Sequence, residues 1–83
     1  MANLKVGVVT HYYDKIGVAI VKLSGNLSIG EEIKISKNDQ EFSQKVESMQ
    51  IEHKNTSEAK KGQTIGLKVD QPALANSQVY KVS

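Results

Sequence analysis

Apolar and polar residues alternate along much of this chain with a period of two, which is the spacing of side chains on one face of a β-strand. The alternation predicts strands over residues 3–13, 31–36, 64–69 and 78–82. In the first of these strands, Leu4, Val6 and Val8 are expected to share one face. The residues expected to point inward are Ile33 and Ile35 in the second strand and Ile65, Leu67 and Val69 in the third.

A further strand is predicted over residues 16–23, and it is apolar on both faces. Ile16, Val18 and Ile20 alternate there with Ala19, Val21 and Leu23. A strand of this kind belongs in the middle of a sheet, or in a barrel wall that is covered on its outer side. We expect the second set to face outward, where loops of this chain or a partner would cover it.

The segment over residues 41–53 fits two patterns. Phe42, Val46 and Met49 have the spacing of one helical face. The same residues also fit a strand whose phase slips once between Val46 and Met49, as a β-bulge would produce. Because every other predicted element is a strand, we favour the bulged strand.

The remaining segments are polar connections. Residues 54–61 are predicted to hold a single helical turn, with Ser57 as its N-cap and Gly62 in the left-handed position after it. Asn76 is expected to turn the chain before the last strand, because asparagine tolerates a left-handed backbone. Six short strands separated by turns predict an all-β barrel or sandwich, and closing a barrel removes exposed sheet edges.

The chain has 83 residues, which suffice for one hydrophobic core, so residues 1–83 are predicted to form a single domain. There is no cysteine, which excludes structural disulfides and thiolate metal sites. No segment has the apolar character of a signal peptide or of a membrane span. We therefore expect a soluble, cytoplasmic protein without membrane contact, and we expect it to be a monomer.

The charged residues are nearly balanced, since 11 lysines and no arginine face 9 acidic residues for a net charge of +2. Without arginine, bidentate guanidinium contacts to phosphate or guanine are excluded. Most lysines of the predicted strands fall in outward phases among acidic residues. This is the pattern of a solvated surface rather than of a basic nucleic-acid stripe.

Residues with catalytic or metal-binding chemistry are few. His11 and His53 are the only histidines, and two ligands are too few for a structural zinc site. No serine lies in a nucleophile-elbow context, and no acidic pair suggests acid–base catalysis. The phosphate-binding pattern GxxxxGK[ST] does not occur. The sequence therefore predicts a protein that is not an enzyme and that uses no metal, cofactor or GTP.

Two surface features are candidates for binding RNA or a protein. Tyr12 and Tyr13 lie close to Lys15, and such a cluster can stack on an unpaired base while the lysine contacts phosphate. The alternative is that the tyrosines pack over one end of the core. Lys60 and Lys61 form the only adjacent lysine pair, at a predicted turn.

Several stretches, in their order and spacing, resemble the second domain of translation GTPases such as elongation factor Tu. They are KIGVAIV at residues 15–21, SIGE at 28–31, AKKG at 59–62 and IGL at 65–67. The resemblance covers residues 6–82 and implies a closed six-stranded Greek-key β-barrel with mainly antiparallel strands. A freestanding copy also resembles the C-terminal barrel of collagenase-like peptidases.

The resemblance also implies a binding site. In tRNA-binding relatives, the pocket for the acceptor end is formed at positions that match Tyr13, Ile16, Gln50 and Leu67, although the relatives carry an arginine and an acidic side chain in place of Ile16 and Gln50. The leading hypothesis is a non-catalytic module of the translation machinery that contacts tRNA, rRNA or a ribonucleoprotein. The alternative is a protein-interaction accessory barrel for a peptidase or an RNA-modifying enzyme.

Overall fold

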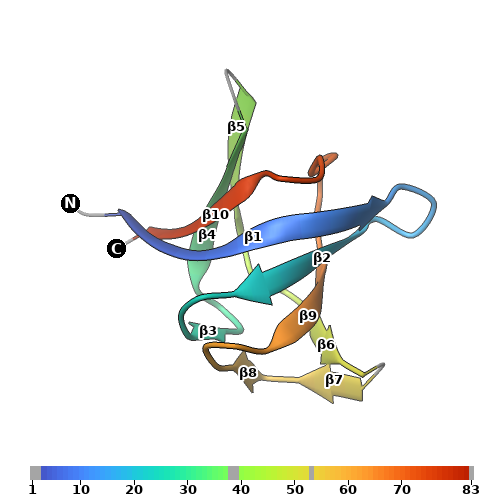
Figure 1. Cartoon of the computed structure of the whole chain (residues 1–83). Helices are drawn as coiled ribbons and strands as arrows, with labels where there is room; N and C mark the ends of the chain where they lie inside the picture. Colours follow the sequence, from blue (N-terminus) through green and yellow to red (C-terminus); the bar gives the residue numbers. More distant parts are fainter. Residues whose placement is uncertain (1–2, 38–39, 53, 83) are drawn as a thin grey trace.

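The computed structural model describes residues 3–37, 40–52 and 54–82, which form strands, turns and loops (Figure 1). The strands are β1 (Asn3–Tyr13), β2 (Val18–Leu23), β3 (Leu27–Ser28), β4 (Glu32–Lys37), β5 (Gln40–Lys45), β6 (Met49–Ile51), β7 (Lys54–Thr56), β8 (Glu58–Ala59), β9 (Thr64–Lys68) and β10 (Gln78–Val82). Among the described residues, no helix is long and apolar enough to cross a membrane.

Eight strands form one sheet in the order β5-β4-β10-β1-β2-β9-β6-β7, and β3 and β8 form a separate two-stranded sheet. Every pair of neighbouring strands in the described ranges is antiparallel. The predicted all-β, mainly antiparallel fold is confirmed.

β5 and β6 are consecutive in the chain but lie far apart in the order of the sheet. Six strand-to-strand steps separate them in the sheet, whereas residues 46–48 alone separate them in sequence. Six steps across a flat sheet would span about 29 Å, but the four residue steps of this connection reach at most about 14 Å. The sheet must therefore roll until its ends approach each other, and Figure 1 shows the connection passing behind β2.

Backbone hydrogen bonds hold the connection at both ends of the rolled sheet. The amide of Val46 donates to the carbonyl oxygen of Glu31 at 2.8 Å, beside the start of β4. The amide of Lys68 donates to the carbonyl oxygen of Ser48 at 3.2 Å, at the end of β9. In the described part of the chain no continuous ladder joins the two ends. The expectation of a closed six-stranded barrel is thus not confirmed, because the ten strands of the described residues form two sheets and the larger sheet is rolled without closing.

The side chain of Gln44 bridges the seam that the ladder leaves open. Its Nε2 donates to the carbonyl oxygen of Lys68 at 2.9 Å, and its Oε1 accepts a hydrogen bond from the amide of Asp70 at 2.8 Å. A side-chain amide carries one donor and one acceptor in nearly the arrangement of a peptide group. Gln44 therefore replaces one strand-pairing step between β5 and the end of β9.

The predicted bulged strand over residues 41–53 is observed as two strands with different neighbours. β5 pairs with β4, whereas β6 pairs with β9 and β7. Val46 and Met49 are both buried, so the slip in their phase marks the crossing from one end of the sheet to the other. His53 lies outside the described residues.

The hydrophobic core lies inside the roll. All five residues predicted to point inward from β4 and from the segment of β9 are buried, which confirms that prediction. The buried apolar residues are Val6, Val9, Ala19, Val21, Leu23, Leu27, Ile33, Ile35, Val46, Met49, Ala59, Ile65, Leu67, Val69, Ala73 and Val79.

Two irregularities in β1 change which of its residues face the core. Its pairing register shifts after Lys5 against β10, and again after Val9 against β2. Each shift reverses the alternation of side chains between the two faces. Val6 and Val9 are therefore both buried, whereas Leu4 is 63% exposed. The expectation that Leu4, Val6 and Val8 share one face is wrong.

β2 lies in the middle of the larger sheet, between β1 and β9, as its two apolar faces predict. Its orientation is the reverse of the expected one. Ala19, Val21 and Leu23 are buried in the core, whereas Val18 and Ile20 are only half-buried on the outer face. A strand that is apolar on both sides does not specify its inner face, so pairing with its neighbours sets the phase.

Residues 54–61 form short strands instead of the predicted helical turn. β7 pairs with β6 and β8 pairs with β3, so Ser57 lies between two strands and caps no helix. Gly62 has the expected left-handed backbone, with φ of 90°, but it lies in the turn before β9. The left-handed backbone predicted for Asn76 is confirmed, with φ of 72°.

Two strand glycines have opposite surroundings. A Cβ atom on Gly7 would lie 2.7 Å from Cγ1 of Val21 and 2.9 Å from the carbonyl oxygen of Lys22, which is shorter than a van der Waals contact. A Cβ atom on Gly66 would lie 3.4 Å from Cγ1 of Val18 and would meet no closer atom. The packing of the sheet therefore requires glycine at position 7, whereas position 66 has room for a Cβ atom.

This difference predicts opposite effects of alanine. Gly7→Ala is expected to lower the free energy of unfolding by about 1–3 kcal/mol through overpacking, whereas Gly66→Ala is expected to raise it by about 0.4–1 kcal/mol by restricting the unfolded chain. Urea denaturation of both variants measures these changes. Equal effects of the two substitutions would contradict the close packing of Gly7.

The Gln44 bridge gives a second prediction. Gln44→Ala removes both of its hydrogen bonds and is expected to lower the free energy of unfolding by about 1–3 kcal/mol in urea denaturation. Gln40→Ala, on the same strand but exposed, is the matched control and is expected to change stability by less than about 0.5 kcal/mol. If the two variants were equally stable, the seam would not depend on the Gln44 side chain.

Candidate functional site

The outer face of the rolled sheet has a hollow where the end of β1 meets β2, β9 and β6. Its volume is about 230 Å³, and most of its lining side chains are apolar. We call it the Gly66 hollow, and its lining residues are Tyr13, Ile16, Val18, Ile20, Gln50, Glu52, Thr64, Ile65 and Gly66.

Gly66 forms the floor of the hollow. It pairs with Ile20 of β2 on one side and with Gln50 of β6 on the other. Because glycine has no side chain, the outer surface drops between the side chains of the two neighbouring strands. Val18 and Ile20 approach this position from β2, at 3.4 Å and 3.8 Å from where a Cβ atom would lie.

The turn between β1 and β2 forms one wall. The amide of Gly17, whose φ is 65°, donates to the carbonyl oxygen of Tyr13 at 2.9 Å. The amide of Val69 donates to the carbonyl oxygen of Gly17 at 2.9 Å, which fixes the turn to the chain after β9. The turn presents Ile16 with 65% of its surface exposed and Tyr13 with 51% exposed. Large apolar side chains held at the surface in this way indicate a binding surface.

The opposite wall is the hairpin of β6 and β7. Nε2 of Gln50 donates to Oδ1 of Asn55 across the hairpin at 3.1 Å. Glu52 follows β6 with φ of 52°, a left-handed conformation that costs a non-glycine residue about 1–2 kcal/mol. Among the residues that the structure describes, Glu52 is also the only charged one that lines the hollow. The rim is therefore acidic on this side, at a position whose backbone would favour glycine or asparagine.

Three of the site residues predicted from the sequence, Tyr13, Ile16 and Gln50, meet in the Gly66 hollow. Lys15 is exposed in the same turn as Ile16. Tyr12 is partly buried against the core, which agrees with the packing alternative rather than with a stacking platform.

The other predicted site residues lie elsewhere. Leu67 is fully buried in the core, so its side chain offers no surface to a partner. Lys60 and Lys61 are exposed in the turn before β9, where the amide of Lys61 donates to Oδ1 of Asn26 at 3.2 Å, and neither lysine lines the hollow. The predicted set is thus divided between one surface, the core and a separate turn.

Sequence reasoning missed six lining residues, namely Val18, Ile20, Glu52, Thr64, Ile65 and Gly66. Val18 and Ile20 were missed because the opposite face of β2 was expected to point outward. The signal for Gly66 was present, since the inward phase of its neighbours in β9 already placed this glycine on the outer face. A glycine on an exposed strand face marks a depression.

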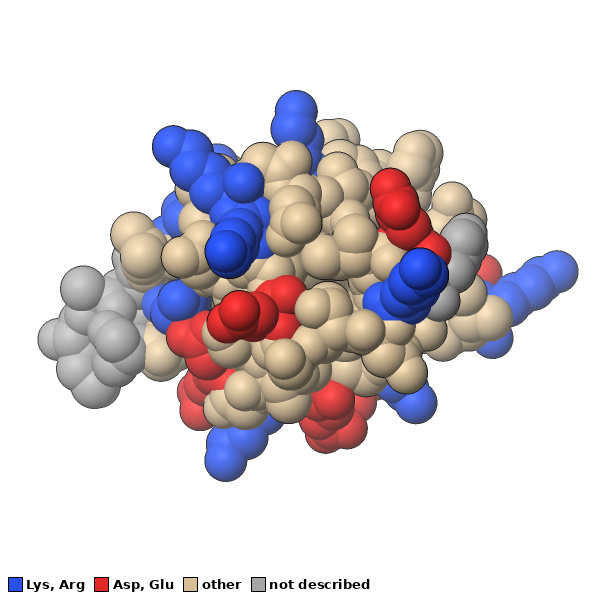
Figure 2. Space-filling view, turned by 90° about the horizontal axis from the view of Figure 1, so that it is seen from below, with Lys and Arg blue, Asp and Glu red and all other residues tan. Residues whose placement is uncertain are grey.

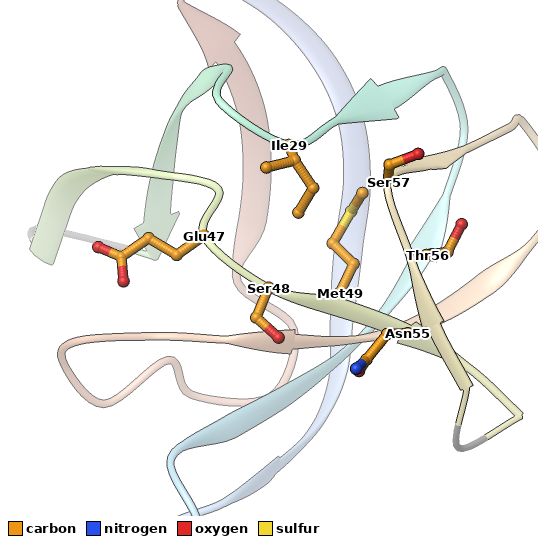
Figure 3. Close-up of a pocket in the computed structure, with 7 residues that line it drawn as sticks. All are labelled: Ile29, Glu47, Ser48, Met49, Asn55, Thr56 and Ser57. Atoms are coloured by element: carbon orange, nitrogen blue, oxygen red, sulfur yellow. The ribbon is translucent and has the colours of Figure 1, made fainter.

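A second hollow, of about 330 Å³, lies between β3 and the hairpin of β6 and β7. Its lining residues are Ile29, Glu47, Ser48, Met49, Asn55, Thr56 and Ser57. Figure 3 shows the side chains of Ile29 and Met49 extending into this space, whereas the carboxylate of Glu47 and the hydroxyl groups of Thr56 and Ser57 point away from it. No polar groups of these seven residues converge as they would in a catalytic site.

Charged groups are dispersed over the surface. On the face shown in Figure 2, lysine and acidic side chains are interspersed. Lys34 pairs with Glu41 at 3.3 Å, and Lys81 pairs with Glu31 at 3.0 Å. No group of three or more His, Cys, Asp or Glu residues within the described ranges could hold a metal ion.

No family model matches the chain. An uncharacterized protease of Methanocaldococcus jannaschii is 36% identical over 79 residues, which cover 94% of this chain and 19% of the protease. The chain thus spans about a fifth of the length of this curated relative.

Two solved structures have the same fold. Both are of the C-terminal domain of a "putative U32 peptidase" of Geobacillus thermoleovorans, one being its selenomethionine variant. The TM-scores are 0.89 for the domain and 0.85 for the variant, with 22% sequence identity in each case. The alignments cover 96% and 90% of this chain and 93% and 95% of the solved chains.

These relatives correct the interpretation of the sequence. The matched proteins are an uncharacterized protease and a putative U32 peptidase, and not elongation factors, so the expected translation-factor relationship and role in protein biosynthesis are wrong. The RNA-binding expectation rested on that relationship and on the cluster of Tyr12, Tyr13 and Lys15, and the relatives do not support it. The resemblance to the C-terminal barrel of peptidases is supported in its place, and the fold is that of the Geobacillus domain.

Proposed function

We propose that this chain is a non-catalytic accessory domain that docks onto the catalytic unit of a peptidase. The observation that carries the proposal is the match to the archaeal protease, which spans nearly all of this chain but 19% of the protease. The Geobacillus C-terminal domain, which has the same fold, supports a position beside a separate catalytic unit.

The chemistry of the side chains supports a non-catalytic role. Catalysis of peptide hydrolysis requires an activated nucleophile or a metal-bound water. The described residues include no candidate metal cluster, and the second hollow has no converging polar groups. His11 stacks on Tyr13 with ring centroids 6.4 Å apart, and no acidic residue pairs with it among the described ion pairs.

The Gly66 hollow supports a docking role. Its wall carries two of the most exposed large apolar side chains, Tyr13 and Ile16, beside a turn that a hydrogen bond fixes to the chain after β9. Contacts between domains are usually modest in area and partly polar, which suits an apolar hollow with an amide and a carboxylate on its rim.

Docking predicts a direct interaction with a peptidase unit. This chain is mixed with the part of the Methanocaldococcus jannaschii protease that lies outside the matched 79 residues, and binding is measured by calorimetry. We expect a one-to-one complex with a Kd in the micromolar range, equivalent to about 8 kcal/mol. The Kd should change little between low and high salt, because apolar burial rather than counterion release drives association.

The non-catalytic role is tested in the same preparation. The chain alone is incubated with casein, and we expect no cleavage products. A chimera in which this chain replaces the matched region of the protease serves as a second measurement if the truncated protease does not fold. Absence of binding in both formats, or hydrolysis by the isolated chain, would refute the proposal.

A further inference from the structure

We propose that the Gly66 hollow binds a protein segment in which a large apolar side chain stands next to a lysine or arginine. The inference rests on the proposed docking function and adds the chemistry of the docked segment. The apolar side chain lies over Gly66, and the basic group lies against Glu52.

The size of the hollow fits one large side chain. Its volume of about 230 Å³ exceeds the roughly 150 Å³ of an apolar cavity that accommodates benzene. Val18 and Ile20 line it from β2, and Ile16 and Tyr13 stand at its edge. A leucine, isoleucine, methionine or phenylalanine side chain would remove these four apolar surfaces from water together with its own.

The charge of the lining selects a basic neighbour for this side chain. Glu52 is the only charged lining residue in the described part of the chain, and a carboxylate accepts hydrogen bonds but donates none at neutral pH. A lysine or arginine side chain supplies both the opposite charge and the donors. The same carboxylate repels phosphate, which disfavours nucleic acid at this position.

Two lysines lie on the outer face beside the hollow without lining it. Lys68 is the cross-strand partner of Val18 and Lys22 is that of Thr64, so one lysine lies at each end of the hollow. Glu52 is therefore the group in the described lining that a basic residue of the bound segment would contact.

The backbone conformation of Glu52 indicates that the turn itself does not require a glutamate side chain. The residue has φ of 52° and directly follows Ile51, which pairs with Lys54 across the hairpin. Glycine or asparagine would satisfy this conformation better. A glutamate at this position gives the hollow its charge at the expense of turn stability.

The chemistry is tested first with two short peptides. The ¹⁵N-labelled chain is titrated with acetylated and amidated Gly-Ser-Leu-Arg-Ser-Gly, and separately with Gly-Ser-Leu-Glu-Ser-Gly. We expect the Leu-Arg peptide to shift the amides of Val18, Gly66 and Glu52 in a saturable way, and the Leu-Glu peptide to bind at least fivefold more weakly. No shifts at these amides, or equal shifts with both peptides, would overturn the proposal, as would a single-stranded RNA oligonucleotide that shifts them in place of the peptides.

Matched variants then test the hollow against the truncated archaeal protease. Ile16→Ser is expected to weaken binding about tenfold through lost apolar contact, whereas Leu4→Ser, with nearly the same exposure at 63% against 65%, should leave the Kd within twofold. Glu52→Gln is expected to weaken binding about two- to fivefold, and Glu58→Gln, which is exposed on β8, is its control.

One further variant separates binding from folding. Glu52→Gly removes the carboxylate and relieves the left-handed glutamate, so it should raise the melting temperature while it weakens binding. If the protease unit binds the parent chain and all the variants equally, docking stands but the hollow is not its site. If the unit does not bind at all, the proposed docking function fails, and the peptide titration still decides the chemistry of the hollow.

Discussion

The short connection between β5 and β6 is the constraint on which the rest of this structure depends. Residues 46–48 must join strands that lie six steps apart in the sheet, and three residues can do so only if the sheet rolls. Rolling creates an inside, in which Val46 at the start of the connection and Met49 directly after it are buried. The Gln44 side chain then satisfies a carbonyl and an amide that the open seam leaves without strand partners.

The strand order determines where a surface hollow can form. It places β6 next to β9, so that Gln50 flanks Gly66 on the side opposite Ile20. The missing side chain of Gly66 then becomes a depression between two strands rather than a gap at a sheet edge. The turn of Tyr13 to Gly17 is fixed to the chain after β9, which holds the exposed Ile16 over that depression. The hollow is thus a consequence of topology, and its lining residues decide what it binds.

Sequence patterns predicted those strands whose apolar residues occupy one face. Ile33 and Ile35 in β4, and Ile65 and Leu67 in β9, alternate with polar or small residues and are buried as expected. The pattern failed where burial depends on pairing with distant strands. β2 is apolar on both faces, so its phase was undetermined, and the two register shifts in β1 leave no mark in a single sequence.

For the candidate site, resemblance to a fold located the place but not the chemistry. Tyr13, Ile16 and Gln50 were predicted from matching positions in tRNA-binding barrels, and they do meet in one hollow. The backbone sets where a surface lies, whereas side chains set which ligand it prefers. Most of the described lining side chains are apolar, and Glu52 is the one charged residue among them. On the proposed docking surface, this side-chain chemistry rather than the position of the hollow therefore decides the class of partner.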